Sequence, residues 1–245
     1  MKCLMLVAGY ATRMYALTRE YPKPLLKVRE KAILDWLLED LVASDQIEEY
    51  ILISNHKYID DFRLWAQKQP IPIRLIDNGT SSNEERLGAV RDIQFAVDAA
   101  GIDDDLLVVA GDYLTDFSLT HFIDFALEKK TSCIMHCVEP DLKSLRRSGV
   151  CELGEDGLLL NLVEKPAEPK THLSALPFYY YTAEDVRKIP TAIAEGCGTD
   201  APGSLVSWMC RNSTVYSMEM PGLHFDVGDL ESYENAQKNF PGILK

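Results

Sequence analysis

A glycine followed closely by an arginine, and then a lysine before a proline, are the first residues whose types suit phosphate chemistry. Gly9 ends an apolar run and is followed by Tyr10-Ala11-Thr12-Arg13, and Lys23 precedes Pro24. A glycine lets backbone N–H groups approach phosphate oxygens, and a guanidinium adds a matching fork of donors. The competing interpretation is a tight turn with surface cations. The spacing matches neither Gly-x-Gly-x-x-Gly nor Gly-x-x-x-x-Gly-Lys-Ser/Thr, which disfavours a dinucleotide site and a Walker loop.

Two aspartates follow short apolar runs and suit a hard cation. Asp112 comes after Leu106–Ala110 and Gly111, and Asp226 lies in Phe225-Asp226-Val227-Gly228-Asp229. Mg²⁺ prefers one or two carboxylates together with phosphate oxygens and water. A helix cap or a solvent contact would explain either aspartate alone. The two predict a shared metal only if the fold brings them together.

These residues need elements that place them at one edge of a sheet. The apolar runs 4–8, 50–53, 73–76 and 106–110 read as buried strands. Segments 32–43, 58–67 and 88–100 between them read as helices, the first with one apolar stripe. This strand–helix alternation predicts a Rossmann-like, three-layer α/β unit with a mostly parallel sheet, whose ligands bind beyond the carboxyl ends of the strands.

The second part of the chain has a different pattern. Runs 133–138, 150–153, 158–163 and 174–181 read as strands, and Gly154-Glu155-Asp156-Gly157 predicts a hairpin turn. Helices are expected near 183–188 and 204–210, a strand at 215–218 and a closing helix near 230–238. We therefore expect one domain, 1–245, with a Rossmann-like half up to about residue 130 and an antiparallel substrate-binding lobe over 131–245.

The charge and composition of the chain limit the classes of partner that it can bind. The 245 residues carry 25 basic and 38 acidic side chains, a formal net charge of −13, which argues against nucleic acid as the main partner. No stretch reaches the ~20 apolar residues needed to span a bilayer, so no membrane partner is expected. The N-terminal run is shorter than a signal peptide, and the six scattered cysteines read as reduced core thiols, so we expect a cytoplasmic protein.

Several segments resemble, in order along nearly the whole chain, the sugar-phosphate nucleotidyltransferases, and glucose-1-phosphate thymidylyltransferases in particular. They are Leu6–Met14 with Tyr21–Leu26, Val109–Asp112, Ser148–Val150 with Val163–Pro166, and Phe225–Gly228. The resemblance implies the nucleotidyltransferase fold, Mg²⁺ as cofactor, and a nucleoside triphosphate and a sugar 1-phosphate as substrates.

The resemblance also implies a role for each matched residue. Arg13, Lys23, Asp112 and Asp226 would be catalytic, and Asp112 and Asp226 would hold the metal. The triphosphate would bind the loop Ala8, Gly9, Tyr10, Ala11, Thr12 and Arg13 together with Lys23 and Asp112, and the nucleobase would lie against Gly88. The sugar phosphate would contact Gly149, Glu164, Lys165 and, if it faces the sugar and not the core, Tyr179.

The chemistry that follows needs no strong base, because a sugar phosphate is already anionic near neutral pH. Such a site has to position two polyanions and stabilise the charge of an in-line transition state. No Ser–His–Asp or Cys–His arrangement is apparent, and none of the five histidines (His56, His121, His136, His172, His224) falls in a matched segment. We treat these histidines as structural or surface residues.

Some features depart from the family. The chain is short for a thymidylyltransferase and stops soon after Asp226, so we do not expect an allosteric site or a tetramer built from a longer C-terminal region. Pro177 stands about where the family often has glycine beside the sugar, so the sugar contacts are expected to differ. Polar segment 77–85 before Gly88 does not identify the base. Glucose 1-phosphate with dTTP or UTP is favoured, and other nucleotides and phosphorylated alcohols stay open.

Three alternatives compete with this interpretation. Within the same chemistry, the chain is a CTP-dependent cytidylyltransferase acting on phosphocholine or another phosphorylated alcohol. From another class, it is a non-catalytic nucleotide-sugar sensor, although the set Arg13, Lys23, Asp112 and Asp226 weighs against one. A metal-dependent glycosyltransferase would usually carry Asp-x-Asp, whereas Asp112 is followed by Tyr113-Leu114. The sequence does not decide the oligomeric state.

Overall fold

The computed structural model describes residues 1–243, which form two compact units. We call the first the N-terminal unit; it holds residues 3–86, 110–121 and those from 221 onward. The second, the central unit, holds residues 1–2, 87–109 and 122–220. The units therefore interleave along the chain, and the expected single domain with halves meeting near residue 130 stays a prediction.

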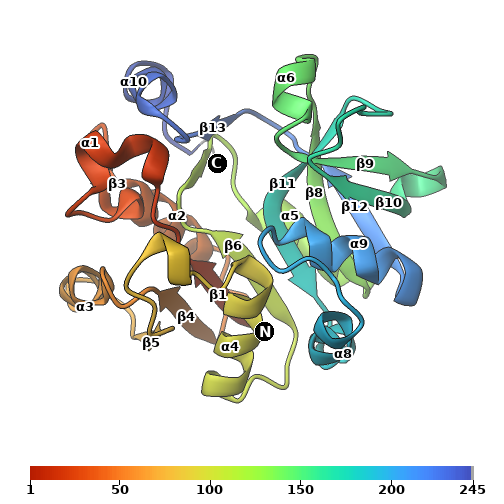
Figure 1. Cartoon of the computed structure of the whole chain (residues 1–245), viewed down its shortest axis with the longest axis horizontal. Coiled ribbons are helices and arrows are strands. Elements are labelled where there is room, and N and C mark those ends of the chain that lie inside the picture. Colours follow the sequence, from red (N-terminus) through yellow and green to blue (C-terminus); the bar gives the residue numbers. More distant parts are fainter. Residues whose placement is uncertain (244–245) are drawn as a thin grey trace. The chain divides into compact units, whose positions relative to one another are not determined.

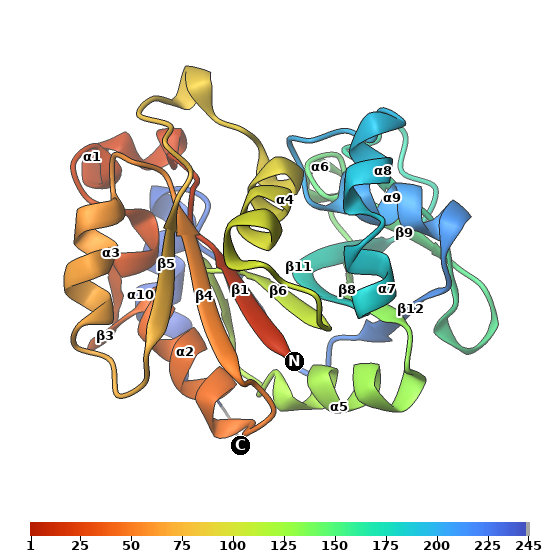
Figure 2. The same ribbon diagram turned by 90° about the horizontal axis from the view of Figure 1, so that it is seen from below.

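Parallel strands form the sheet of the N-terminal unit. Its neighbours are β1 (Lys2–Leu6), β4 (Glu49–Ser54) and β5 (Ile73–Asp77), in that order. Tyr50 stands opposite Ile73 in the parallel β4–β5 pair. Helices α2 (Ile33–Ala43) and α3 (Ile59–Ala66) follow the expected amphipathic segments. Figure 2 shows the three strands side by side, with α3 alongside β5. The predicted alternation of buried strands and amphipathic helices is confirmed here.

Shorter elements complete this unit. They are η1 (Thr12–Met14), α1 (Tyr15–Thr18), η2 (Lys23–Leu25), β2 (Lys27–Val28), β3 (Lys31–Ala32), η3 (Asn83–Glu85), β7 (Tyr113–Thr115), β13 (His224–Asp226) and α10 (Leu230–Asn239). β13 pairs antiparallel with β7, so Asp226 stands opposite Tyr113. The Asp229 side chain caps α10 by accepting from the Ser232 N–H at 2.9 Å.

A hydrophobic cluster fixes the C-terminal segment to the rest of the N-terminal unit. Its buried members come from η1, β2, α2, β7, the β13–α10 connection and α10: Met14, Val28, Ile33, Leu114, Val227, Ala236 and Phe240. The rings of Trp36 and Phe240 meet edge to face, with centroids 5.3 Å apart. Burial of these side chains stabilises the contact by which β13 delivers Asp226 to this unit.

Antiparallel pairing dominates the central unit, as expected for its lobe. β11 (Leu173–Tyr181) pairs antiparallel with β6 (Leu106–Ala110), β8 (Ser132–Val138) and β9 (Gly149–Leu153), and β9 with β10 (Leu159–Glu164). β12 (Val215–Glu219) instead runs parallel to β8. The β11–β8 register shifts between Leu176 and Tyr179, where Pro177 lacks an N–H for the ladder. Figure 1 shows these strands around β11.

Helices cover this sheet. They are α4 (Ala89–Ala100), α5 (Thr120–Lys129), α6 (Leu142–Leu145), α7 (Ala183–Val186), α8 (Ile189–Ala194) and α9 (Gly203–Asn212), and η4 (Glu155–Gly157) forms the expected hairpin turn. The sequence analysis did not anticipate α5 or α8. Phe122, Ile123 and Ala126 bury one face of α5, a pattern that was present in the sequence. Within residues 1–243, the structure contains no helix long and apolar enough to cross a membrane.

Candidate active site

The loop after β1 has a fixed and partly strained backbone. Ala11 lies in the left-handed region with φ 45° and ψ 46°, just before η1. The Thr18 hydroxyl donates to the Ala11 carbonyl at 3.0 Å, and the buried Asn55 amide donates to the Ala8 carbonyl at 3.0 Å. The Tyr10 hydroxyl is hydrogen-bonded to Thr80 at 3.1 Å. These contacts leave Gly9 exposed, with open space on the side where a side chain would stand.

A pocket of about 190 Å³ lies over this loop. Its lining combines the loop with the end of β1, η2 and the turn after β6: Leu6, Val7, Gly9, Ala11, Arg13, Lys23, Pro24, Asp112 and Gly228. Lys23 is 7% exposed and its Nζ donates to Oδ2 of Asp112 at 2.8 Å. The structure therefore brings together the predicted loop, both predicted cations and one predicted metal ligand within the N-terminal unit.

Asp226, at the end of β13, lies beside Gly228, which lines this pocket. A Cβ atom added at Gly228 would lie 2.9 Å from Oδ2 of Asp226 and 3.3 Å from a guanidinium nitrogen of Arg13, so glycine leaves room for both. Surrounding protein raises the pKa of the Asp226 carboxyl, and the charge of Asp112 raises it further, while Lys23, Arg13 and His224 act in the opposite direction. Asp226 is exposed.

The donor set of this pocket fits a magnesium ion. Asp112 and Asp226 are hard oxygen ligands that interact electrostatically, and Mg²⁺ takes its remaining ligands from phosphates and water. Among residues 1–243, no three His, Cys, Asp or Glu side chains gather to hold a metal by themselves. A metal in this pocket would therefore need the nucleotide phosphates to complete its coordination.

Gly88 lies in the central unit, at the start of α4. Its φ of 89° is strained for residues with a side chain, and a Cβ atom there would lie 2.4 Å from the Thr199 carbonyl oxygen. The N–H groups of Ala89 and Val90 donate to the Asp200 and Thr199 carbonyls, each at 3.1 Å. Glycine is thus required at this position by the backbone packed against it, whatever its role toward a base.

The predicted acceptor residues meet at the β9–β10 edge of the central unit. Glu164 stands directly opposite Gly149 in the antiparallel ladder. Burial raises the pKa of the Glu164 carboxyl and Asp200 adds to this, whereas Lys165 and the Gly203 N–H lower it. Lys165 follows with a positive φ of 47°, and its Nζ lies 4.0 Å from a carboxylate oxygen of Asp200. The structure therefore groups Gly149, Glu164 and Lys165.

Tyr179 is placed differently from the other predicted acceptor residues. Its side chain is 4% exposed and its ring stacks in parallel on that of Tyr181, with centroids 6.1 Å apart. The sequence left open whether this tyrosine faces the sugar or the core. Its burial matches the core alternative, and a sugar contact from it stays a prediction.

A larger pocket in the N-terminal unit, of about 670 Å³, lies away from these residues. It is lined by side chains of α2, α3 and the segment near η2, among them Tyr21, Asp35, Asp61 and Trp65. None of the predicted site residues lines it. We place the candidate active site in the smaller pocket, because the predicted phosphate-binding loop, both predicted cations and Asp112 line it and Asp226 lies beside Gly228 at its edge.

Comparison with known proteins identifies the family. The profile of the family described as "Nucleotidyl transferase" matches residues 2–241. The chain belongs to this family. The protein is therefore a nucleotidyltransferase, and the expected family, fold and class of enzyme are confirmed.

Individual relatives are distant but cover the chain. A UTP–glucose-1-phosphate uridylyltransferase of Haloferax volcanii is 23% identical over 97% of this chain and 96% of its own length. A mannose-1-phosphate guanylyltransferase catalytic subunit beta of Drosophila melanogaster is 25% identical over 95% of this chain, which spans only 60% of that relative.

Solved structures share the fold of this nucleotidyltransferase. A UDP-glucose pyrophosphorylase in complex with UDP-glucose superposes with a TM-score of 0.82 over 98% of this chain and 97% of the other, at 17% identity. A UTP-bound enzyme of the same name from Acinetobacter baumannii gives a TM-score of 0.78 over 98% and 92%, at 19% identity. At these identities the likeness establishes the Rossmann-like nucleotidyltransferase fold alone.

Three residues that shape the site were not singled out from the sequence. Asn55 donates to the Ala8 carbonyl, Gly228 leaves space beside Asp226, and Gly203 leaves space beside Glu164. An asparagine directly after a buried strand was a readable signal for the first. Gly228 lies two residues after Asp226, within the motif Phe225–Gly228. Gly203 acts on Glu164, which is distant in sequence, so no local pattern reveals it.

Proposed function

We propose that this nucleotidyltransferase joins a nucleoside triphosphate to a sugar 1-phosphate, giving a nucleoside diphosphate sugar and pyrophosphate. The observation that carries the proposal is the convergence of Gly9, Arg13, Lys23 and Asp112 around one pocket, with Asp226 at its edge. Two cations, an exposed glycine loop and two acids suit a polyphosphate with its metal.

Each step of the proposed reaction uses a residue already described. A phosphate oxygen of the acceptor attacks the α-phosphorus, the bond from that phosphorus to the bridging oxygen of the β-phosphate breaks, and pyrophosphate leaves with the electron pair. Arg13 stabilises the leaving pyrophosphate. Lys23, released from Asp112, donates a hydrogen bond to a non-bridging oxygen of the α-phosphate. Mg²⁺ held by Asp112 and Asp226 would neutralise phosphate charge during transfer.

On the acceptor side, the central unit supplies an anionic and a cationic group. Glu164 would accept hydrogen bonds from sugar hydroxyls, and Lys165 would contact the sugar's phosphate. Gly88 would let the nucleobase lie close to the backbone. These roles rest on the family resemblance together with the grouping of Gly149, Glu164 and Lys165 at one sheet edge.

We favour dTTP or UTP as the nucleotide and glucose 1-phosphate as the acceptor. The uridylyltransferase relative, which the chain covers almost end to end, supports this choice. The guanylyltransferase relative keeps GTP with mannose 1-phosphate under consideration. A CTP-dependent transfer to phosphocholine is the alternative within the same chemistry.

A panel assay tests the proposal. Pyrophosphate release is measured with Mg²⁺ for dTTP, UTP, CTP, GTP and ATP, each against a set of sugar 1-phosphates and phosphocholine. Release that depends on one nucleotide and one sugar 1-phosphate supports the proposal and names both substrates. Release only with CTP and phosphocholine selects the alternative. Nucleotide binding without release for any pair overturns transfer to these acceptors and favours a sensor.

A further inference from the structure

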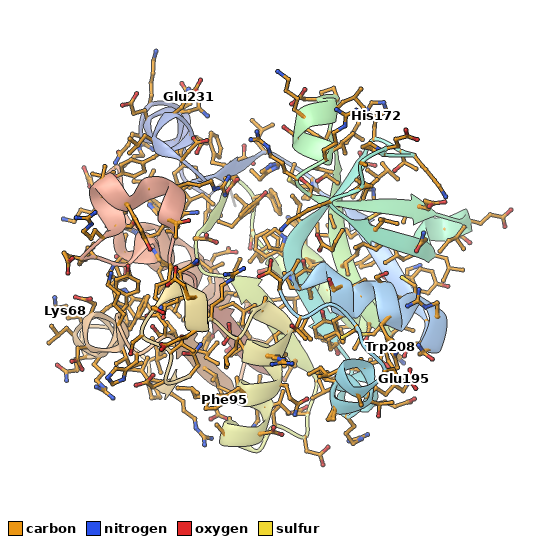
Figure 3. The ribbon with its side chains drawn as sticks, viewed as in Figure 1. Lys68, Phe95, His172, Glu195, Trp208 and Glu231 are labelled. Atoms are coloured by element: carbon orange, nitrogen blue, oxygen red, sulfur yellow. The ribbon has the colours of Figure 1, made fainter. Side chains whose placement is uncertain are left out.

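The segment Thr199–Gly203 of the central unit connects α8 to α9 and contacts two predicted substrate sites. Glu195 lies four residues before Thr199, directly after α8, and its carboxylate accepts from the Trp208 indole N–H at 2.8 Å. Figure 3 shows these two side chains together beside α9. Gly203 is the first residue of α9.

At its C-terminal end, the segment holds Glu164. The N–H of Gly203 lowers the pKa of the Glu164 carboxyl, as the free N–H groups of a helix N-terminus are suited to do. A Cβ atom at Gly203 would lie only 2.0 Å from Oε1 of Glu164. Any side chain at this position would therefore drive the carboxylate out of its place.

A second glycine completes the space for the carboxylate. Gly149 stands opposite Glu164 in the β9–β10 ladder, and a Cβ atom there would lie 3.4 Å from the same oxygen, Oε1. The carboxylate thus sits between two glycine backbones, and the Gly203 N–H favours its charged form. An ionised carboxylate offers about four lone-pair sites, so most of its capacity stays available for hydroxyl donors.

At its N-terminal end, the segment fixes Gly88. The carbonyls of Thr199 and Asp200 accept from the first two N–H groups of α4, and the Thr199 oxygen would lie 2.4 Å from a Cβ at Gly88. The same short stretch of backbone therefore touches the glycine assigned to the nucleobase and the acid assigned to the acceptor.

We propose that Thr199–Gly203 is a positioning element, in which Gly203 holds the Glu164 carboxylate ready for acceptor hydroxyls while Thr199 and Asp200 fix Gly88. This inference rests on the proposed transfer reaction and extends it. It assigns the acceptor class as phosphates that carry hydroxyl groups, because a carboxylate with free lone pairs between two glycines suits O–H donors. Gly203 acts through Glu164 and is not itself a catalytic residue.

The first test is Gly203→Ala, with Ser207→Ala on the same helix as the matched control. Alanine favours the helix, so Gly203→Ala is expected to fold and to displace only the carboxylate. We expect the KM for the sugar 1-phosphate to rise about 10- to 100-fold, the range for losing a hydrogen bond to a charged group. The nucleotide KM and kcat should change less than about 3-fold, as should every constant of Ser207→Ala. An unchanged acceptor KM in Gly203→Ala overturns the proposal.

The second test does not depend on turnover. The amide ¹H and ¹⁵N shifts of Gly203 are followed by NMR against pH in the wild type and in Glu164→Gln. We expect a titration in the wild type and none in the variant; the other charged groups that face Glu164 are Lys165 and Asp200. A Gly203 amide that does not titrate, or that titrates equally in both proteins, overturns the contact. A titrating amide in a protein that transfers to no acceptor would instead reject the proposed function.

Discussion

The Nζ atom of Lys23 lies 2.8 Å from Oδ2 of Asp112, so a predicted phosphate ligand and a predicted metal ligand form an ion pair. The lysine side chain is 8% exposed and that of the aspartate 37%. This pair keeps both charges compensated until nucleotide and metal arrive. Each partner then has a new counter-ion, Lys23 a phosphate oxygen and Asp112 a magnesium ion, if the proposed reaction is correct.

Asp112→Asn is expected to lower kcat by about 10²- to 10³-fold, the loss typical for removing one electrostatic stabiliser of a transition state. The side chain keeps its shape and loses the charge that would hold the metal. Pyrophosphate release at saturating Mg²⁺ measures this, with circular dichroism to verify folding. Asp124→Asn, at an exposed position on α5, is the charge-matched control. A folded Asp112→Asn protein with wild-type turnover would remove Asp112 from the metal site.

Lys23→Met and Asp112→Asn are expected to be non-additive in the free energy of unfolding. Each single change leaves a charge without its partner, whereas the double variant removes both. We expect a coupling of about 1 kcal/mol, because the exposed side of Asp112 weakens the pair through solvent screening. Urea unfolding of the four proteins measures it. Strict additivity would mean that the 2.8 Å contact adds nothing to stability.

Magnesium binding is expected to weaken on acidification at a higher pH than an ordinary aspartate would cause. Burial raises the pKa of Asp226, and a proton on that carboxyl excludes the metal. Below the raised pKa the Asp226 carboxyl is protonated and does not bind Mg²⁺, and above it the carboxylate is ionised and can bind the metal. Isothermal titration with Mg²⁺ and a non-hydrolysable nucleotide at a series of pH values gives the midpoint. Asp226→Asn should abolish this dependence; an unaltered pH profile in that variant would assign it to another group.

The parts of the fold that could be predicted are those encoded locally. The short apolar run 106–110 predicts a buried strand, and the apolar stripe of α2 at helical spacing predicts an amphipathic helix. The turn at Gly154–Gly157 could be predicted because glycine and aspartate are typical turn residues. α5 carried a readable pattern but follows a β7 strand that was itself missed, so its start had no marker.

The site divides in the same way. Gly9, Arg13 and Lys23 are close in sequence and could be predicted together as phosphate ligands, whereas the meeting of Asp112 and Asp226 depends on the β13–β7 pairing. Nothing in the residues around Asp226 specifies that pairing; it arises because Val227 and Phe240 bury themselves with Leu114. Sequence spacing could propose a shared metal but could not place the second acid.

Lys165→Gly and Lys165→Ala are expected to separate function from backbone strain. Both remove the ammonium group, so both should weaken sugar-phosphate binding more than nucleotide binding. Lys165 has a φ of 47°, a conformation that costs a residue with a side chain about 1–2 kcal/mol and that glycine adopts freely. After the larger entropy of glycine in the unfolded chain is subtracted, Lys165→Gly should be more stable than Lys165→Ala by roughly 0.5–1 kcal/mol.

At the exposed Lys170, whose φ is not positive, the same two substitutions should rank in the reverse order. Urea unfolding gives the stabilities and initial-rate kinetics the two KM values. Equal loss of affinity for both substrates would contradict the assignment of Lys165 to the acceptor's phosphate, and a less stable glycine variant would contradict the strain.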